Sequence, residues 1–296
     1  MLSNSYTHIQ VTTADQLQLN GLLMPGSPEK TACIFIHGFT TDFYSHAFYH
    51  SMAKSLSADG HAFILAQNRG TGVQTEMLRV GKPGVFLGSY FEKLEDAHLD
   101  ISAFIEFLQT QGYKKFCLIG HSLGTIKTVR YLSEGKHADS IEKIILLSPF
   151  DKNAYMERKM PGKLQSYVAR AKQEVANGNG GAQVPIPEFE DYAISYETYV
   201  SWYEGTELNS MWDFYRERDG YSFQTLQKIA VPTRVVLGAD DQFMLFPEFG
   251  VSPQSALACV EKHVADCKTE LLPGCDHVFL GFEDQLAAIV QKFANE

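Results

Sequence analysis

The chain of 296 residues is 45% apolar and 20% charged, which is typical of a globular protein with one large domain or a core that carries an insertion. Its formal net charge of −10 argues against nucleic acid or an anionic membrane surface as a partner, because both would repel an acidic protein. Residues 1–26 lack the basic start and apolar run of a signal peptide, and no window holds about 18 uninterrupted apolar residues. We therefore expect a cytoplasmic protein without a membrane span.

Cysteine usage argues against a disulfide framework and against a zinc site. The five cysteines are an odd number, and none stands in a C-x-x-C pair. Without an export signal, we expect free thiols in a reducing compartment. The sequence predicts neither a metal site nor a cofactor.

The first predicted elements are short strands. Residues 6–11 and 17–23 alternate like an N-terminal hairpin. The apolar runs 31–36 and 62–66 are typical of strands buried on both faces. We expect both runs to lie in the centre of a sheet.

A helix is predicted at 45–59, between the two apolar runs. His46 and His50 stand four apart in it, which is metal-ligand spacing on a helix. Ala47 takes the place of the glutamate that the H-E-x-x-H arrangement needs. We expect the two histidines to lie on a solvated helix face.

A loop and an amphipathic helix are predicted next. Residues 69–72, Arg-Gly-Thr-Gly, lack the rest of a phosphate-binding motif, so we interpret them as a plain loop. Residues 94–108 have helical periodicity. Four nearby carboxylates are most simply a solvated acidic face: Glu92, Glu95, Asp96 and Asp100.

The most informative stretch joins a predicted strand at 116–119 to a predicted helix that begins near Thr125. Between them, residues 120–124 (Gly-His-Ser-Leu-Gly) fit G-x-S-x-G. In a strand–turn–helix, this motif places a serine hydroxyl at the tip of a sharp turn. The glycines suit a turn that leaves no room for Cβ atoms. We predict that Ser122 is a nucleophile.

The alternation of strands and helices sets the expected fold. A further strand at 141–147 completes a pattern that predicts an α/β fold with parallel strands and right-handed crossovers. From 151 to 228 the alternation lapses in a tyrosine-rich segment that holds both tryptophans. We expect 151–228 to be an inserted helical cap on a core made of 1–150 and 229–296. Most of its rings should fill the cap itself, and a few should line a pocket.

Two later strand ends carry candidate partners for Ser122. Asp241 follows a predicted strand at 231–237, and His277 follows one at 268–272. Open α/β sheets build their sites at the carboxyl ends of strands, so these side chains should meet the serine. A serine nucleophile needs a base, and the base needs an orienting group. We predict His277 as the base and Asp241 as the acid.

The identity of the acid stays open between three residues. Asp240 is adjacent to Asp241, and Asp151 follows the strand at 141–147. We favour Asp241, because Asp240 is more simply a turn residue that bonds its own backbone. Of the other histidines, His37 and His121 should shape the loops beside the site.

An acyl-transfer site also needs two backbone N–H donors for the developing oxyanion. Leu123, directly after the nucleophile, supplies one at a helix N-terminus. The second should come from His37-Gly38-Phe39, after the strand at 31–36, and we predict the N–H of Phe39.

These residues together resemble the α/β-hydrolase superfamily over nearly the whole chain. The resemblance implies an eight-stranded, mostly parallel sheet with a cap after the sixth strand. It implies Ser122 as nucleophile, His277 as general base and acid, and Asp241 as orienting acid. Residues 124–127 (Gly-Thr-Ile-Lys) are also similar to esterases related to fungal siderophore esterases. The motifs that carry the superfamily resemblance are His37-Gly38-Phe39, residues 120–124, residues 238–241 (Gly-Ala-Asp-Asp) and residues 275–277 (Cys-Asp-His).

The sequence thus predicts a cofactor-free serine hydrolase, most simply a carboxylesterase acting on a small molecule with an apolar or aromatic part. Thioester, amide, lactone and carbon–carbon cleavage stay open, because one oxyanion site serves them all. A binding protein that keeps the fold without catalysis is less favoured, because every catalytic role has a residue.

Overall fold

The computed structural model describes residues 5–185, 193–204 and 207–296. Its centre is an eight-stranded sheet with strand order β1-β2-β4-β3-β7-β8-β9-β10. The first two pairs are antiparallel and the other five parallel. This confirms the predicted mostly parallel, eight-stranded α/β fold. The strands are β1 (Thr7–Thr12), β2 (Gln18–Met24), β3 (Ala32–Ile36), β4 (Phe63–Ala66), β7 (Phe116–His121), β8 (Ile141–Leu147), β9 (Thr233–Gly238) and β10 (Cys267–Leu272).

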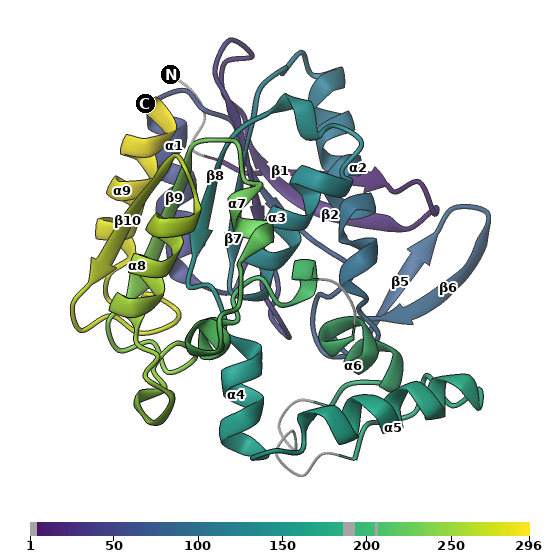
Figure 1. The fold of residues 1–296 in the computed structure, drawn as a ribbon. Coiled ribbons are helices and arrows are strands. Elements are labelled where there is room, and N and C mark those ends of the chain that lie inside the picture. The colour runs from purple at the N-terminus through teal and green to yellow at the C-terminus, as the bar shows by residue number, and fades with distance from the viewer. Residues whose placement is uncertain (1–4, 186–192, 205–206) are drawn as a thin grey trace.

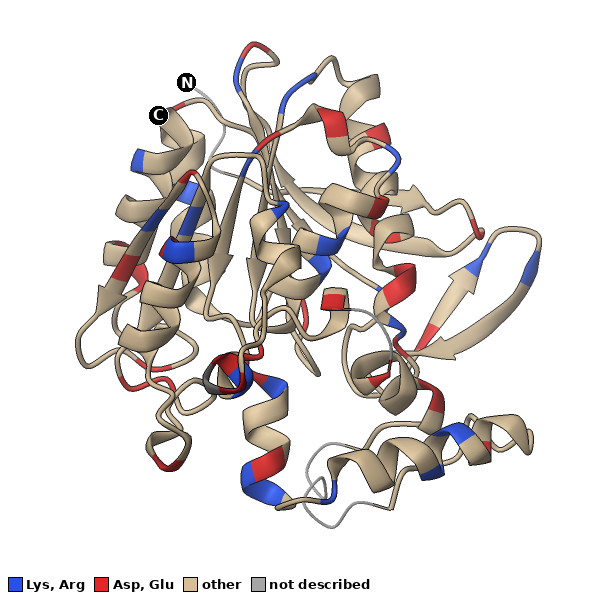
Figure 2. Cartoon of the chain, in the orientation of Figure 1, with Lys and Arg blue, Asp and Glu red and all other residues tan. Residues whose placement is uncertain are grey.

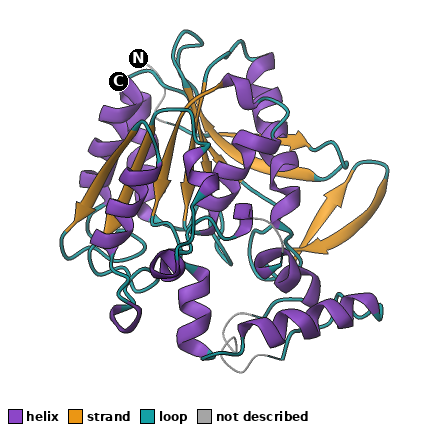
Figure 3. Cartoon of the chain, in the orientation of Figure 1, coloured by secondary structure: helices purple, strands orange, loops and turns teal. Residues whose placement is uncertain are grey.

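Helices cover both faces of the sheet (Figures 1 and 3). Alternate side chains of a strand point to opposite faces, so a continuous apolar run serves two layers. In β3, Phe35 packs in the cluster that also contains α1 and α9 residues, whereas Ile34 packs with α2, α3 and α8. The helices are α1 (Ala47–Ala58), α2 (Ala97–Thr110), α3 (Leu123–Glu134), α8 (Pro253–His263) and α9 (Glu283–Asn295), with short 3₁₀ turns at Leu94–Asp96, Ala138–Ser140, Glu207–Asn209, Phe214–Asp219 and Pro247–Phe249.

A two-stranded hairpin beside the main sheet was not predicted. β5 (Thr75–Arg79) and β6 (Lys82–Leu87) form it, and Figure 1 shows it projecting from the body of the molecule. Of its strand residues only Met77 is buried. Its apolar residues are adjacent, at 77–78 and 85–87, so the hairpin lacks the alternation by which a strand is recognised.

The segment after β8, the sixth strand of the sheet in chain order, contains α4 (Lys152–Lys159), α5 (Leu164–Ala176), α6 (Tyr196–Tyr203) and the short α7 (Gln224–Gln227). Figure 1 shows α4, α5 and α6 beyond the carboxyl ends of the strands. α4 and α5 pack around a separate apolar cluster, whereas Trp202 and Trp212 belong to the main core. The cap boundaries 151–228 stay a prediction.

The predicted solvated acidic face is wrong for two of its four carboxylates. Glu92 and Asp100 are each 1% exposed. Asp100 pairs with Arg69 at 2.7 Å, and Glu92 pairs with Lys127 at 2.5 Å. Buried carboxylates need such partners, and both cations are distant in sequence, so periodicity alone could not reveal the pairing.

Charged residues of both signs are spread over the molecule (Figure 2). Figure 2 shows acidic and basic residues interspersed over the core and over α4 and α5. Within the described residues, every helix is too short or too polar to cross a bilayer. Each of the five cysteines is free.

Candidate active site

Ser122 lies on a tight turn between β7 and α3. Its backbone has φ 54° and ψ −122°, a region that costs a non-glycine residue strain of about 1–3 kcal/mol. The N–H of Ser122 donates to the carbonyl of Leu147 on β8 at 2.9 Å. A Cβ on Gly124 would lie 2.2 Å from the carbonyl oxygen of Ile36. The second glycine of the motif therefore lets α3 approach β3, and the hydroxyl is held at the strand ends.

Asp241 and His277 meet directly at the ends of β9 and β10. Nδ1 of His277 lies 2.9 Å from Oδ1 and 2.8 Å from Oδ2 of Asp241. Asp241 is 0% exposed and His277 is 6% exposed. A Cβ on Gly238 would lie 2.2 Å from the carbonyl oxygen of Cys275, so this glycine allows the two loops to approach each other. The carboxylate fixes Nδ1 as the protonated nitrogen and leaves Nε2 for another partner.

The two other carboxylates considered from the sequence lie elsewhere. Asp151 caps α4, where it accepts hydrogen bonds from the N–H of Ala154 at 2.9 Å and of Tyr215 at 3.0 Å. Burial raises the pKa of Asp151 to about 7. Asp240 is exposed. Of the three, Asp241 is the one in contact with the imidazole of His277.

A cavity of about 260 Å³ brings the predicted groups together. Ser122 and His277 both line it, as do Gly38 and Phe39 of the loop after β3. Phe39 and Trp202 meet edge to face with their ring centroids 4.7 Å apart. Five of its thirteen lining residues are phenylalanine, tyrosine or tryptophan: Phe39, Phe150, Tyr155, Trp202 and Phe243.

The site thus combines a strained turn at Ser122 with a buried pair of Asp241 and His277 beside one cavity. A comparison with known families agrees with this arrangement. The family model described as serine aminopeptidase, S33, matches residues 27–285. The chain belongs to this family of α/β hydrolases. The finding confirms the resemblance to the α/β-hydrolase superfamily and supports hydrolytic activity.

Solved structures agree with this hydrolase fold. An esterase of Pyrococcus furiosus has 17% identity and a TM-score of 0.62, over 98% of this chain and 91% of that one. Est1E of Butyrivibrio proteoclasticus, with ferulic acid bound, has 18% identity and a TM-score of 0.65, over 96% of each chain. A thermophilic esterase of Thermogutta terrifontis, with malate bound, has 16% identity and a TM-score of 0.57, over 98% and 97%. These likenesses concern the fold alone. No curated protein sequence matches the chain.

His121 connects the turn at Ser122 to the loop that carries His277. Its Nε2 donates to the carbonyl oxygen of His277 at 2.9 Å, which places the proton on that nitrogen. Burial lowers the pKa of His121 well below its usual value, and nearby His277 adds to the effect. The neutral ring therefore supports the backbone of the proposed base, as expected for a loop-shaping histidine.

His46 is a cavity residue that sequence reasoning missed. The histidine pair was expected on a solvated face, but His46 lines the cavity directly before the first turn of α1. Its ring stacks on Phe48, with centroids 5.8 Å apart. His50 instead contacts the hydroxyl of Tyr6 at 2.9 Å. Helical spacing could not have found His46, because it precedes the helix.

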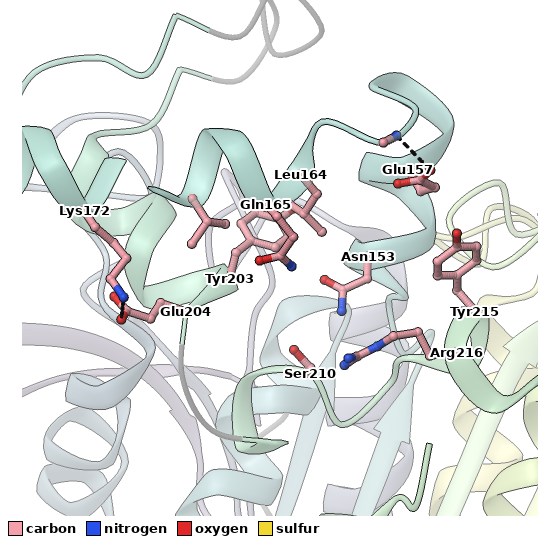
Figure 4. Close-up of a pocket in the computed structure, with 12 residues that line it drawn as sticks. Asn153, Glu157, Leu164, Gln165, Lys172, Tyr203, Glu204, Ser210, Tyr215 and Arg216 are labelled. Carbon is pink, nitrogen blue, oxygen red and sulfur yellow. Dashed lines mark hydrogen bonds and ion pairs between the residues drawn. The ribbon is translucent and has the colours of Figure 1, made fainter. Parts of the chain in front are cut away.

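A second cavity, of about 460 Å³, lies between α4, α5 and the end of α6 (Figure 4). Ser122 and His277 do not line it. Its charged side chains are paired within the protein: Lys172 with Glu204, Arg216 with Asp213, and Glu157 with the N–H of Gly162. This self-pairing leaves little charge to attract an ionic ligand. Among the described residues, no group of three or more metal-binding side chains gathers.

Proposed function

We propose that this hydrolase cleaves carboxylic esters through an acyl-enzyme on Ser122. His277 takes the proton of the hydroxyl through Nε2 as the oxygen attacks the acyl carbon, and Asp241 orients the ring through Nδ1. The N–H groups of Phe39 and Leu123 stabilise the oxyanion. The imidazolium then protonates the departing alcohol, and water, activated by the same histidine, frees the acid.

The observation that carries the proposal is the contact between Asp241 and His277 beside the strained turn of Ser122. A binding protein would have no use for a buried carboxylate that fixes the tautomer of a cavity histidine. A strained residue at a cavity is also the usual sign of a group held ready for reaction.

The lining of the cavity supports esters over peptides with a free α-amino group. A buried ammonium needs a carboxylate partner. Among the described residues that line this cavity, none is Asp or Glu. We therefore propose a neutral ester of a small molecule with an apolar or aromatic part, and keep thioester, amide, lactone and carbon–carbon cleavage as alternatives with the same machinery.

We also propose that 151–228 is a cap that contributes Tyr155 and Trp202 to the substrate pocket. A cap that excludes water strengthens the electrostatic contacts of the site. The cytoplasmic location stays a prediction from the sequence.

The test combines turnover with covalent labelling. Wild-type protein should hydrolyse p-nitrophenyl esters of several acyl lengths, and a fluorophosphonate probe should label it but not Ser122→Ala. Circular dichroism should show that the variant keeps its fold. Wild-type protein that is labelled but turns over none of the esters would favour the alternative bonds. Absence of both labelling and turnover would contradict the enzymatic proposal.

A further inference from the structure

A buried charge pair lies behind the loop that carries Gly38 and Phe39. Lys127 projects from α3, and its Nζ lies 2.5 Å from Oε1 of Glu92. Each residue is 1% exposed. Among the described residues, Lys127 is the one cation within ion-pair distance of Glu92. A Cβ on Gly70 would lie 2.3 Å from the Glu92 carboxylate, so the glycine there leaves room for the pair.

Stability does not explain the burial of this pair. Removing two charges from water costs more than their attraction returns in many proteins, and well-packed apolar residues of similar volume are often as stable or more so. Breaking such a pair is costly only because one charge stays behind unpaired. The pair therefore needs a use that two apolar side chains could not serve.

Asn68 connects the pair to the loop after β3. Nζ of Lys127 donates to Oδ1 of Asn68 at 3.3 Å. Nδ2 of Asn68 donates to the carbonyl oxygen of His37 at 3.3 Å, and its backbone N–H donates to Nε2 of His37 at 3.4 Å. The backbone N–H of Gly70 also donates to Oδ1 of Asn68, at 3.0 Å. The two donors hold Oδ1 on their side and leave Nδ2 facing His37.

His37, which Asn68 holds, in turn contacts the peptide between Gly38 and Phe39. Its Nδ1 lies 3.0 Å from the carbonyl oxygen of Gly38, which can only accept. Nε2 also lies 2.8 Å from Oγ1 of Thr71, whose single proton can go either to Nε2 or to the carbonyl oxygen of Asn68, also at 2.8 Å. With the proton of His37 on Nδ1, the ring donates to Gly38 and accepts from the N–H of Asn68, and the Thr71 hydroxyl is the second donor when it turns toward Nε2. Burial lowers the pKa of His37 to about 3, and the charge of Lys127 adds to it, so the ring stays neutral.

The bond to Gly38 fixes the direction of the next N–H. The peptide between Gly38 and Phe39 is trans, so its C=O and N–H point in opposite directions. Holding the carbonyl therefore aims the N–H of Phe39. This peptide lies beside the nucleophile, since a Cβ on Gly38 would be 2.9 Å from Cβ of Ser122.

We propose that Lys127 and Glu92 are positioning residues for the loop His37-Gly38-Phe39, here called the oxyanion loop. They act through Asn68 and His37 on the peptide that carries the N–H of Phe39. The inference rests on the proposed function, since it assigns a support to one of its oxyanion donors. The proposed support links α3, the helix that follows Ser122, to the N–H of Phe39. Both Ser122 and this N–H must face the same acyl group.

The decisive variant is the double change Lys127→Met with Glu92→Met, which removes both charges and nearly keeps the volume. It leaves no unpaired buried charge, so it should fold. A lost oxyanion donor costs about 10²–10³ in kcat, and a misdirected one should cost less. We expect kcat on a p-nitrophenyl ester to fall about 10- to 100-fold, with KM changed by less than about twofold. The affinity of a trifluoromethyl ketone, which forms an oxyanion on the serine, should fall by the same factor as kcat/KM.

A matched control is Arg130→Met with Glu134→Gln on the same helix. Arg130 is also buried and pairs with Glu134 at 2.9 Å, but it bonds Asn209 rather than the oxyanion loop. This control should keep kcat within about twofold of wild type.

Several outcomes would overturn the positioning role. One is a folded Lys127/Glu92 double variant with unchanged kcat and unchanged ketone affinity; another is a loss confined to KM. If the double variant does not fold, Asn68→Leu, which nearly keeps the volume and removes the amide between Lys127 and His37, is measured in the same way with the same criteria. A wild type that turns over no ester and escapes the fluorophosphonate would remove the proposed function and this proposal together.

Discussion

The carboxyl ends of the strands and the segment 151–228 contribute to the cavity in different ways. The strand ends supply short polar contacts, such as the two bonds between His277 and Asp241. The segment supplies rings: Tyr155 packs with Phe243 at a centroid distance of 5.6 Å. A hydrogen bond weakens steeply with small displacements, whereas apolar contacts tolerate changes of shape and volume. We therefore expect reactivity to depend on the sheet and selectivity to depend on the segment.

The two regions also differ in how they are anchored. The strand ends of the site emerge from the two large apolar clusters of the sheet, whereas α4 and α5 also pack around a small cluster of their own. Trp202 joins the segment to the core, since it lies in the core cluster and in the cavity wall. Substitutions in the two regions should thus separate rate from substrate preference. Two predictions test that separation, and a third tests the stability of the junction between the regions.

The largest effect is expected for Asp241→Asn. An amide in place of the carboxylate permits the wrong tautomer of His277, and kcat should fall by about 10³- to 10⁴-fold with a nearly unchanged KM. Steady-state kinetics on a p-nitrophenyl ester measures this. Asp240→Asn is the control, because Asp240 is exposed beside the same turn, and it should retain wild-type rates. Comparable losses in both variants would contradict the assignment of the acid.

A smaller effect is expected for Tyr155→Ala on α4. An aromatic contact contributes about 0.5–1.5 kcal/mol beyond its buried area, so KM for an aromatic acyl ester should rise up to about tenfold. KM for an acetate ester and kcat for both should change by less than about twofold. Tyr167→Ala, on α5 and outside the cavity lining, should change neither. Equal losses on the acetate and the aromatic ester would place Tyr155 in the chemistry and not in selectivity.

The smallest effect concerns the junction of the two regions at Lys152. Burial lowers the pKa of this amine to about 7, from 10.5. Between these values the unfolded chain binds more protons than the folded one, so this residue makes stability rise with pH. Lys152→Met should therefore show a smaller increase in Tm from pH 7.5 to 9 than wild type, measured by circular dichroism. Lys159→Met, at the exposed end of α4, should keep the wild-type slope. Equal slopes for wild type and Lys152→Met would contradict this account.

Much of the fold was predictable because buried parallel strands are continuous apolar runs. Residues 31–36 and 141–147 were recognised in this way, and both are strands of the sheet. The same logic failed for β5 and β6, whose apolar residues are mostly exposed and do not form a continuous run as long as those of the central strands. Periodicity therefore predicted the strands that are buried in the core and missed the hairpin of β5 and β6, which is mostly exposed.

The candidate site was predictable where position along a strand decides position in space. Ser122, Asp241 and His277 were chosen because each follows a strand, and parallel strands end at one edge of a sheet. His46 has no such marker and was assigned to a solvated face. The pairing of Glu92 with Lys127 was missed for a related reason: it joins residues whose proximity depends on how helix and loop pack, which no local pattern encodes.

The bond from His121 to the carbonyl of His277 has one further consequence. The residue that precedes the proposed nucleophile holds the main chain of the proposed base, so a displacement of the turn should move both residues together. We therefore expect the alignment of Ser122 with His277 to depend on this local contact more than on motions of the sheet as a whole.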